Sequence, residues 1–167
     1  NTGVKSVEYE IMAPEQSQSE QPGIEYLMNP RPIFDNPNYK GSGKLKNKVA
    51  IVTGGDSGLG RACSIAYIKE GAKVVIVYYD EDKDAFDTKN YIESLGGECL
   101  LIRGDITKHK FCKYIVDATI NKYGKIDILV NNAGVQYQQD CLENISDEQF
   151  DLTYKVNVYS MFYLTKE

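Results

Sequence analysis

Two short segments of the sequence combine residue types and spacings that suit the binding of a dinucleotide. The first is Thr53-Gly54-Gly55-Asp56-Ser57-Gly58-Leu59-Gly60, directly after a short apolar run. Its glycines permit a tight turn, the approach of a pyrophosphate and close packing of a helix on a strand. A helix starting here offers free N–H groups to phosphates. The spacing is Gly-x-x-x-Gly-x-Gly, not Gly-x-Gly-x-x-Gly, and alone it also suits a structural turn.

The second segment is Asn131-Asn132-Ala133-Gly134, which follows the apolar run Ile128-Leu129-Val130. An amide at the carboxyl end of a buried strand can satisfy neighbouring strands and also contact a ribose, and Ala133-Gly134 leaves room for a flat ring. Gly104-Asp105-Ile106 follows another apolar run, so the Asp105 carboxylate could accept from an adenine amino group or act as a helix cap or turn residue. Three such segments at one sheet edge favour a ligand site.

The elements that must position these segments alternate regularly along the chain. Continuous apolar runs predict buried strands at 48–53, 73–79, 98–103 and 126–131, and periodic apolar positions predict helices at 61–70, 83–95 and 107–123, the last capped by Thr107. The residues expected on the inner side of the second helix are Ala85, Phe86, Tyr91, Ile92 and Leu95. A further helix begins at Ser146. This pattern predicts an α/β fold, a doubly wound parallel sheet of Rossmann type represented by its cofactor-binding half plus one helix.

Residues 1–44 differ from the rest of the chain and are expected to form an extended N-terminal arm. They contain all five prolines and a polar run at 15–21, so residues 1–22 are expected to be mobile. Residues 23–44 are more apolar and should lie extended across the folded domain or a neighbouring subunit, with Gly41-Ser42-Gly43 as a flexible join. Residues 45–167 would then form the dinucleotide-binding domain.

Composition narrows the class of protein. The chain has 167 residues with 19 basic and 24 acidic side chains, a formal charge of −5, which argues against nucleic acid as a partner. No apolar run is long enough to cross a membrane and no signal peptide is seen, so we expect a soluble, cytoplasmic protein. Four cysteines and one histidine, His109, lack metal-ligand spacing, so no metal site is predicted, the cysteines are expected to be reduced and His109 solvated.

The glycine loop, Asp105, Asn131 to Gly134 and Asn157 together resemble the cofactor half of a short-chain dehydrogenase/reductase, over residues 45–167. The N-terminal extension, with Gln21-Pro22-Gly23 and Gly41 to Leu45, is similar to the branch of glucose/ribitol dehydrogenases and general-stress oxidoreductases. The resemblance implies NAD or NADP as cofactor. It implies cofactor contacts at Gly54, Asp56, Ser57, Gly58, Leu59, Gly60, Tyr78, Tyr79, Asp105, Ile106, Asn132, Ala133, Gly134 and Val156.

The choice between NAD and NADP depends on the charges near the end of the second strand. An acid there selects the ribose 2′-hydroxyl, whereas a basic residue accommodates a 2′-phosphate. Tyr78-Tyr79 occupies that place, so neither rule applies directly. Asp56 and Asp80-Glu81-Asp82 would repel a phosphate, and Arg61 and Lys83 are the nearest counter-charges. The balance favours NAD.

The catalytic part of the resemblance is incomplete. Asn157 matches the family's helical asparagine, which helps to hold a water in the proton relay, although a structural backbone contact would explain it equally well. The family's Ser, and its Tyr and Lys four residues apart, cannot be placed before Glu167. We therefore expect the printed chain alone to bind cofactor poorly and to be inactive, as a truncated chain or one whose C-terminal half is disordered or cleaved.

The implied reaction of the full-length enzyme is hydride transfer between a nicotinamide and a small alcohol, sugar or polyol and its carbonyl. The alternative is a non-catalytic nucleotide-binding or oligomerisation module. Family members are commonly tetramers, so a homo-oligomer is expected, and the strand at 126–131 would be left as an unpaired edge.

Overall fold

Four parallel strands form the centre of the computed structural model, which describes residues 16, 18 and 23–167. They are β1 (Val49–Thr53), β2 (Lys73–Tyr78), β3 (Cys99–Arg103) and β4 (Ile128–Val130), in the order β3-β2-β1-β4. The chain therefore winds first to one side of β1 and then to the other, which is the doubly wound order that the sequence predicts. The stretch predicted to be mobile, 1–22, lies almost entirely outside the described residues.

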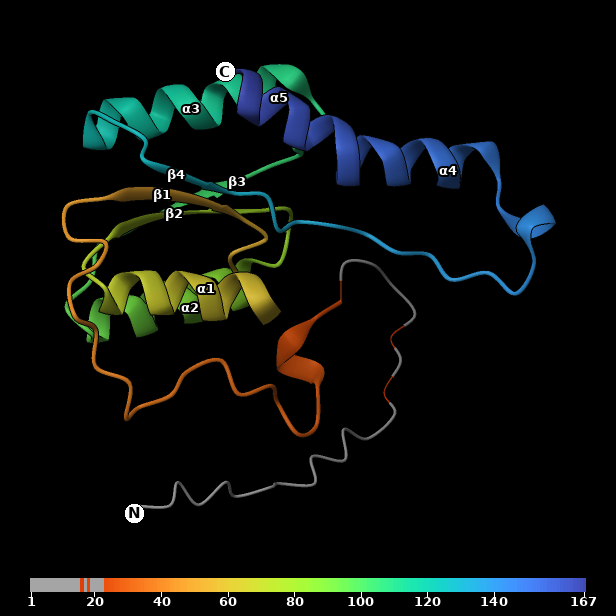
Figure 1. Cartoon of the computed structure of the whole chain (residues 1–167). Coiled ribbons are helices and arrows are strands. Elements are labelled where there is room, and N and C mark those ends of the chain that lie inside the picture. The colour runs from red at the N-terminus through yellow and green to blue at the C-terminus, as the bar shows by residue number, and fades with distance from the viewer. Residues whose placement is uncertain (1–15, 17, 19–22) are drawn as a thin grey trace, which may run out of the picture.

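Helices cover both faces of this sheet (Figure 1). On one face lie α1 (Gly58–Lys69) and α2 (Asp82–Ser94), and on the other lie α3 (His109–Tyr123) and α5 (Ser160–Lys166). Two 3₁₀ turns, η1 (Glu25–Leu27) and η2 (Leu142–Asn144), precede the first strand and the last helical segment. That segment runs through α4 (Asp147–Tyr154) and the π-helical η3 (Lys155–Tyr159) into α5, and Ser146 caps its start as predicted.

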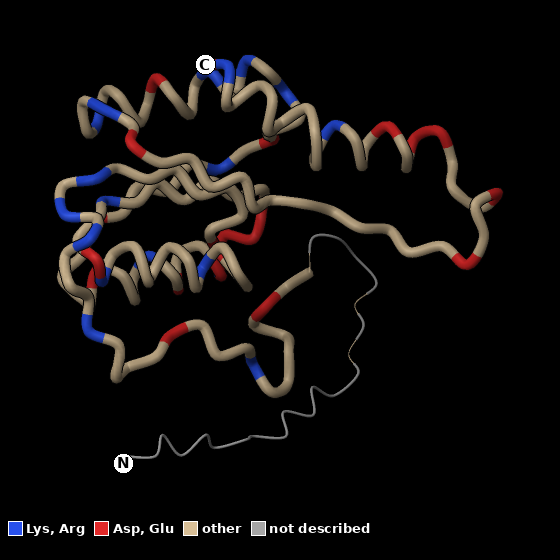
Figure 2. The backbone as a smooth tube through the Cα atoms, in the orientation of Figure 1, with Lys and Arg blue, Asp and Glu red and all other residues tan. Residues whose placement is uncertain are grey.

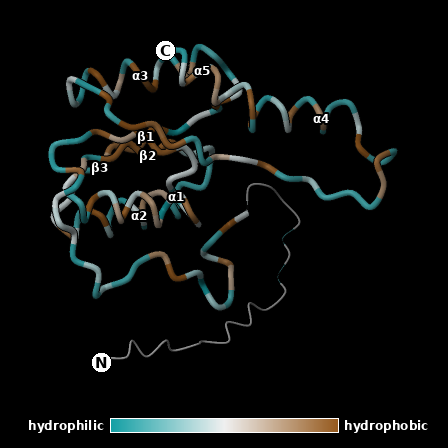
Figure 3. Tube along the Cα trace, viewed as in Figure 1, coloured by the Kyte–Doolittle hydropathy of each residue, from teal (hydrophilic) through white to brown (hydrophobic). Residues whose placement is uncertain are grey.

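The middle residues of the strands are apolar because helices cover both faces of the sheet (Figure 3), whereas polar residues such as Thr53, Lys73 and Arg103 stand at strand ends. Ile51 packs with Ile115 of α3 and Leu164 of α5, whereas the next residue, Val52, packs with Ile65 of α1 and Ile92 of α2. Neighbouring residues of β1 thus belong to two separate cores. Among the described residues, no helix has both the length and the apolar character to cross a membrane.

Three of the local predictions are wrong. Phe86 is 53% exposed, because the buried positions of α2 are Ala85, Thr88 and Ile92, and Leu95 lies at the exposed end of that helix. Thr107 does not cap α3: its backbone N–H is taken by the Asp105 carboxylate, 2.9 Å away, and the helix begins only at His109.

The N-terminal arm is bound to the helical layer of α1 and α2 along its described length (Figure 1). Asp35 pairs with Lys69 (Nζ to Oδ1, 2.5 Å) and accepts from the Tyr91 hydroxyl at 2.7 Å. Gly41-Ser42-Gly43, expected to be a flexible join, is held instead: a β-carbon at Gly41 would overlap the Lys69 carbonyl, and the Ser42 N–H donates to Glu70 at 3.0 Å.

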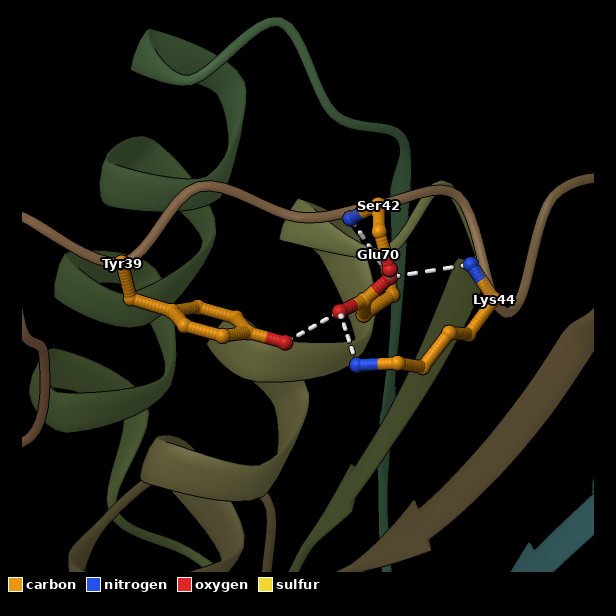
Figure 4. Close-up of polar contacts among 4 residues, drawn as sticks. All are labelled: Tyr39, Ser42, Lys44 and Glu70. Atoms are coloured by element: carbon orange, nitrogen blue, oxygen red, sulfur yellow. Dashed lines mark hydrogen bonds and ion pairs between the residues drawn. The ribbon is translucent and has the colours of Figure 1, made fainter.

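Glu70, at the C-terminal end of α1, is the main anchor of the arm (Figure 4). Its carboxylate accepts from the Tyr39 hydroxyl and from the backbone N–H groups of Ser42 and Lys44, and it also pairs with the Lys44 ammonium at 3.3 Å. These contacts, the Tyr39 hydrogen bond above all, lower the pKa of Glu70 to about 2. An ionised carboxylate therefore fixes the point where the arm enters the domain.

Candidate functional site

The glycine-rich loop joins β1 to α1 at the carboxyl edge of the sheet. Gly54 (φ 61°) and Gly58 (φ 51°) adopt the left-handed conformation, which residues with a β-carbon rarely reach. A β-carbon at Gly60 would overlap the carbonyl oxygen of Gly54 and would lie 2.6 Å from Nδ2 of Asn132. Gly54 and Gly58 therefore make the turn, and Gly60 allows α1 to pack closely against it.

The end of β4 clamps this loop. Nδ2 of Asn132 donates to the carbonyl oxygens of Thr53 and Gly54, at 2.9 and 3.0 Å. In return the Thr53 hydroxyl oxygen accepts from the backbone N–H groups of Asn132 and Ala133, both at 3.0 Å. The adjacent amide differs, since Oδ1 of Asn131 is buried without a hydrogen-bond partner in the described part of the chain. Asn132 thus serves the scaffold.

A cleft of about 510 Å³ opens between these segments. Every residue predicted to contact a cofactor lines it except Gly60, which lies behind the loop. The lining residues are Gly23, Gly54, Asp56, Ser57, Gly58, Leu59, Val77, Tyr78, Tyr79, Glu81, Gly104, Asp105, Ile106, Thr107, Asn132, Ala133, Gly134, Val135, Tyr137, Leu152 and Val156. The three predicted segments therefore share one cavity.

The charged groups that line the cleft are all acidic. Burial raises the pKa of Asp56, and burial with repulsion from Asp56 and Asp80 raises the pKa of Glu81 to about 7. Tyr78 donates from its hydroxyl to Asp82 at 2.9 Å, and burial together with this contact raises its pKa to about 12. Figure 2 shows that lysines and arginines gather instead toward the end of the sheet where the strands begin.

Apart from Gly23, every residue that lines the cleft lies in the part of the chain that matches a known family. The family model for short chain dehydrogenases matches residues 48–167. The chain belongs to the short-chain dehydrogenase family. The resemblance drawn from the glycine loop and Asn131 to Gly134 is confirmed.

Proteins from bacteria and plants align with most of this chain, including most of the N-terminal arm. General stress protein 39 of Bacillus subtilis (strain 168) is 53% identical over 154 residues, covering 92% of this chain and 54% of that protein. Glucose and ribitol dehydrogenase of Daucus carota is 38% identical over 159 residues, covering 92% of this chain and 55% of that protein. These two relatives support the predicted branch. The chain spans about half of their length.

Solved structures of the family show the same fold. A 3-ketoacyl-(acyl-carrier-protein) reductase from Brucella melitensis complexed with NADH superposes with a TM-score of 0.68 at 37% identity, covering 74% of this chain and 49% of that one. A short-chain dehydrogenase from Burkholderia cenocepacia J2315 in complex with NADP gives a TM-score of 0.70 at 32% identity, covering 74% of this chain and 50% of that one. Family members thus include proteins solved with either cofactor.

Asn157 is outside the lining of the cleft. Its Oδ1 accepts from the backbone N–H of Val135 at 2.9 Å and its Nδ2 donates to the Val135 carbonyl at 2.8 Å. The amide therefore bridges η3 to the strand-exit segment, and Gly134 is close enough that a β-carbon there would lie 3.3 Å from Oδ1. The π-helical turn at this point is a feature often found at functional sites. The structural backbone contact that the sequence allowed for Asn157 is therefore present.

The structure shows the partners of two other polar residues, one of them in a role that the sequence left open. Asp105 lines the cleft while one oxygen accepts from the Thr107 N–H, so it also acts as the turn residue considered above. His109 is not simply solvated, because it pairs with Glu167 (Nε2 to Oε1, 2.8 Å) and stacks on Tyr163 with ring centroids 4.6 Å apart.

Sequence reasoning missed several lining residues, notably Gly23, Val135, Tyr137 and Leu152, and considered Glu81 only as a charge near the ribose. Val135 and Tyr137 follow Gly134 directly, and Gln149 of α4 donates to the Tyr137 carbonyl at 2.8 Å. Their participation could have been inferred by extending the cleft along the chain beyond Gly134. Gly23 carried no local signal, because only the path of the arm brings it to the cleft.

Proposed function

We propose that this chain is the dinucleotide-binding part of a nicotinamide-dependent oxidoreductase. The observation that carries the proposal is the single cleft shared by the glycine loop, the end of β2, Asp105 and the Asn132–Gly134 segment. Gly54, Gly58 and Gly134 line this cleft with backbone alone. The absence of side chains there suits the close approach of a pyrophosphate and a flat ring.

The start of α1 supports an anion site. The first helical hydrogen bond runs from Arg61 N–H to the Ser57 carbonyl, so the N–H groups of Gly58, Leu59 and Gly60 have no partner within the helix. A carboxylate already accepts from the first of them: Oε2 of Glu25 lies 2.5 Å from the Gly58 nitrogen. The next two N–H groups would hold the pyrophosphate.

The other residues that line the cleft would contact successive parts of the dinucleotide. Asp105 and Ile106 would contact the adenine, Tyr78, Tyr79, Asp56 and Ser57 the adjoining ribose, and Ala133, Gly134 and Val156 the nicotinamide side. When bound, the nicotinamide supplies hydride transfer. Asn157 would act by holding Val135 at the cleft and by orienting a water in the proton relay, and the substrate would be a small alcohol, sugar or polyol with its carbonyl partner.

Binding of NADH tests this proposal directly. The chain contains no tryptophan, so the fluorescence of the reduced nicotinamide can be followed without overlapping indole emission. We expect weak but saturable binding to the wild-type chain and its loss in Gly58→Val. Gly58 is exposed, adopts φ 51° and has open space beside it, so the substitution strains the loop more than it crowds the core. Equal binding by both proteins would contradict the proposal.

Catalysis needs a separate test, because a non-catalytic nucleotide-binding or oligomerisation module would also bind NADH. The printed chain should show no dehydrogenase turnover, whereas the whole protein encoded by the gene should oxidise polyols or sugars, or reduce their carbonyls, with NAD or NADP. Binding without turnover by the whole protein would favour the module.

Oligomerisation and cellular location complete the proposal. Large apolar side chains of the last helical segment are exposed, among them Phe150, Val158 and Phe162. An uncovered apolar helix face suits pairing between subunits, and a homotetramer in the cytoplasm is the arrangement that we propose. Light scattering of the whole protein would test the subunit number.

A further inference from the structure

The arm lies against the end of the cleft where the ribose next to the adenine would bind. Gly23 lines the cleft together with Asp56 and Ser57, and η1 follows two residues later. Glu25 in this turn is only 4% exposed. Its backbone N–H donates to Asp84 of α2 at 3.0 Å and its carboxylate reaches the first N–H of α1. The arm therefore forms part of the wall of the site.

The arm also contacts two cations that flank the glycine loop and the end of β2, while a third, Arg103, is paired with Asp82 at 2.8 Å. Arg61 is 5% exposed, and its Nη1 lies 2.7 Å from Oε1 of Glu25. The other face of this guanidinium is covered by Phe34, whose ring centroid is 3.7 Å from Cζ. The second cation, Lys83, lies with Nζ 3.9 Å from the ring centroid of Tyr26. All three covering side chains belong to the arm.

The cleft itself offers no positive side chain to replace them. Its charged lining residues are Asp56, Glu81 and Asp105, and no lysine or arginine is among the described residues that line it. A ribose 2′-phosphate would add about two negative charges at this end. A buried phosphate without a cationic partner is unfavourable, whereas a free 2′-hydroxyl carries no such penalty.

We propose that the N-terminal arm determines cofactor choice: by holding Arg61 with Glu25 and Lys83 with Tyr26, it makes the site select NAD(H) over NADP(H). This inference rests on the proposed function. It assigns to Glu25 the role of a specificity-determining residue that acts through Arg61, because the carboxylate neutralises the one buried guanidinium beside the loop.

The test compares the dissociation constants of NADH and NADPH, measured by nicotinamide fluorescence for the wild-type chain and for Glu25→Gln. We expect the ratio of the NADPH constant to the NADH constant to fall by about tenfold in the variant, which corresponds to about 1.4 kcal/mol. The matched control is Asp35→Asn, which removes one negative charge from the same arm and one partner of a lysine of α1, Lys69, away from the loop. Its ratio should stay at the wild-type value.

A second variant identifies the cation responsible. Arg61→Met should raise the ratio when Glu25 is present, because the buried Glu25 carboxylate then lacks its counter-charge, and should cancel the gain when combined with Glu25→Gln. If Glu25→Gln does not melt cooperatively, Tyr26→Leu provides the test, since it frees exposed Lys83 with little loss of buried contact and should lower the ratio by about twofold.

The outcomes separate the two proposals. Failure of the wild-type chain to bind either dinucleotide would overturn the proposed function and this inference with it. Binding of NADPH as tight as that of NADH, or equal ratios in Glu25→Gln and Asp35→Asn, would overturn the inference alone.

Discussion

Replacing Asn132 with alanine should destabilise the whole sheet edge, although the residue lies in the ligand cleft. Its side-chain amide donates to the carbonyl oxygens of Thr53 and Gly54, and each such hydrogen bond contributes about 1 kcal/mol net. Thr53 is buried, so its carbonyl would lose a partner that water cannot easily replace. We therefore expect the free energy of unfolding to fall by about 2–3 kcal/mol.

Asn131 provides the matched control, because it is the same residue type at the preceding position of the chain. Its Oδ1 has no hydrogen-bond partner among the described residues, so Asn131→Ala removes no intramolecular hydrogen bond from that oxygen. The expected change is within about 1 kcal/mol.

Urea unfolding followed by circular dichroism at pH 7 measures both variants. Equal midpoints for Asn132→Ala and Asn131→Ala would refute the reasoning, since the two amides would then contribute alike. A further check is the denaturant slope, which should be unchanged if the native fold is kept and only its stability differs.

The shifted pKa values of Glu70 and Glu81 predict opposite dependences of stability on pH. Both can be measured by comparing the thermal melting of the wild-type chain with that of the corresponding Gln variant. The pKa of Glu70 is held at about 2, first by the Tyr39 hydroxyl, so its stabilisation is present above the unfolded value and is lost as the pH falls from about 4.5 to about 2. Glu70→Gln should melt lower than wild type at pH 7 and match it at about pH 2; a gap that persists in acid would contradict this assignment. The pKa of Glu81 is raised to about 7, chiefly by burial, so the folded state keeps a proton that the unfolded chain releases and stability falls as the pH rises from about 4.5 to about 7. Glu81→Gln should exceed wild type at pH 8 by on the order of 1–2 kcal/mol and equal it near pH 4, and identical profiles for the two proteins would count against the buried carboxylate.

The strand and helix order could be predicted because each strand contains an apolar run, almost fully buried in β1 and β2 and half-buried in β4 at the sheet edge. Ile51 and Val52 pack into different cores, so successive positions of β1 up to Val52 are apolar and the run stands out in the sequence. The end of each strand then marks the sheet edge, and this is why Asp105 and Asn132 could be assigned to one site before their positions were known.

The exact starts of the helices could not be predicted, because they depend on local contacts that the spacing of apolar residues does not reveal. Helix α1 begins at Gly58, three residues before the predicted start, because the glycine loop itself forms the first turn. Thr107 has the residue type of a helix cap, but its backbone N–H donates to Asp105. Both residues suit a turn or cap by type, and only the path of the chain after β3 determines which of them makes the contact.

The arm could not be predicted to enter the site because its contacts link residues more than thirty positions apart. Glu25 and Arg61 each look like ordinary surface charges in the sequence, yet the pair is almost fully buried. One feature of the sequence indicates that Arg61 could be buried. It directly follows Gly60, and Gly60 packs closely against the loop at the start of α1. A buried guanidinium needs a carboxylate partner, and the acidic residues Asp56, Asp84 and Glu25 compete for it. In the structure Arg61 pairs with Glu25 of the arm. Asp84 instead accepts from the backbone N–H of Glu25 and thereby fixes the turn from which the Glu25 carboxylate reaches Arg61.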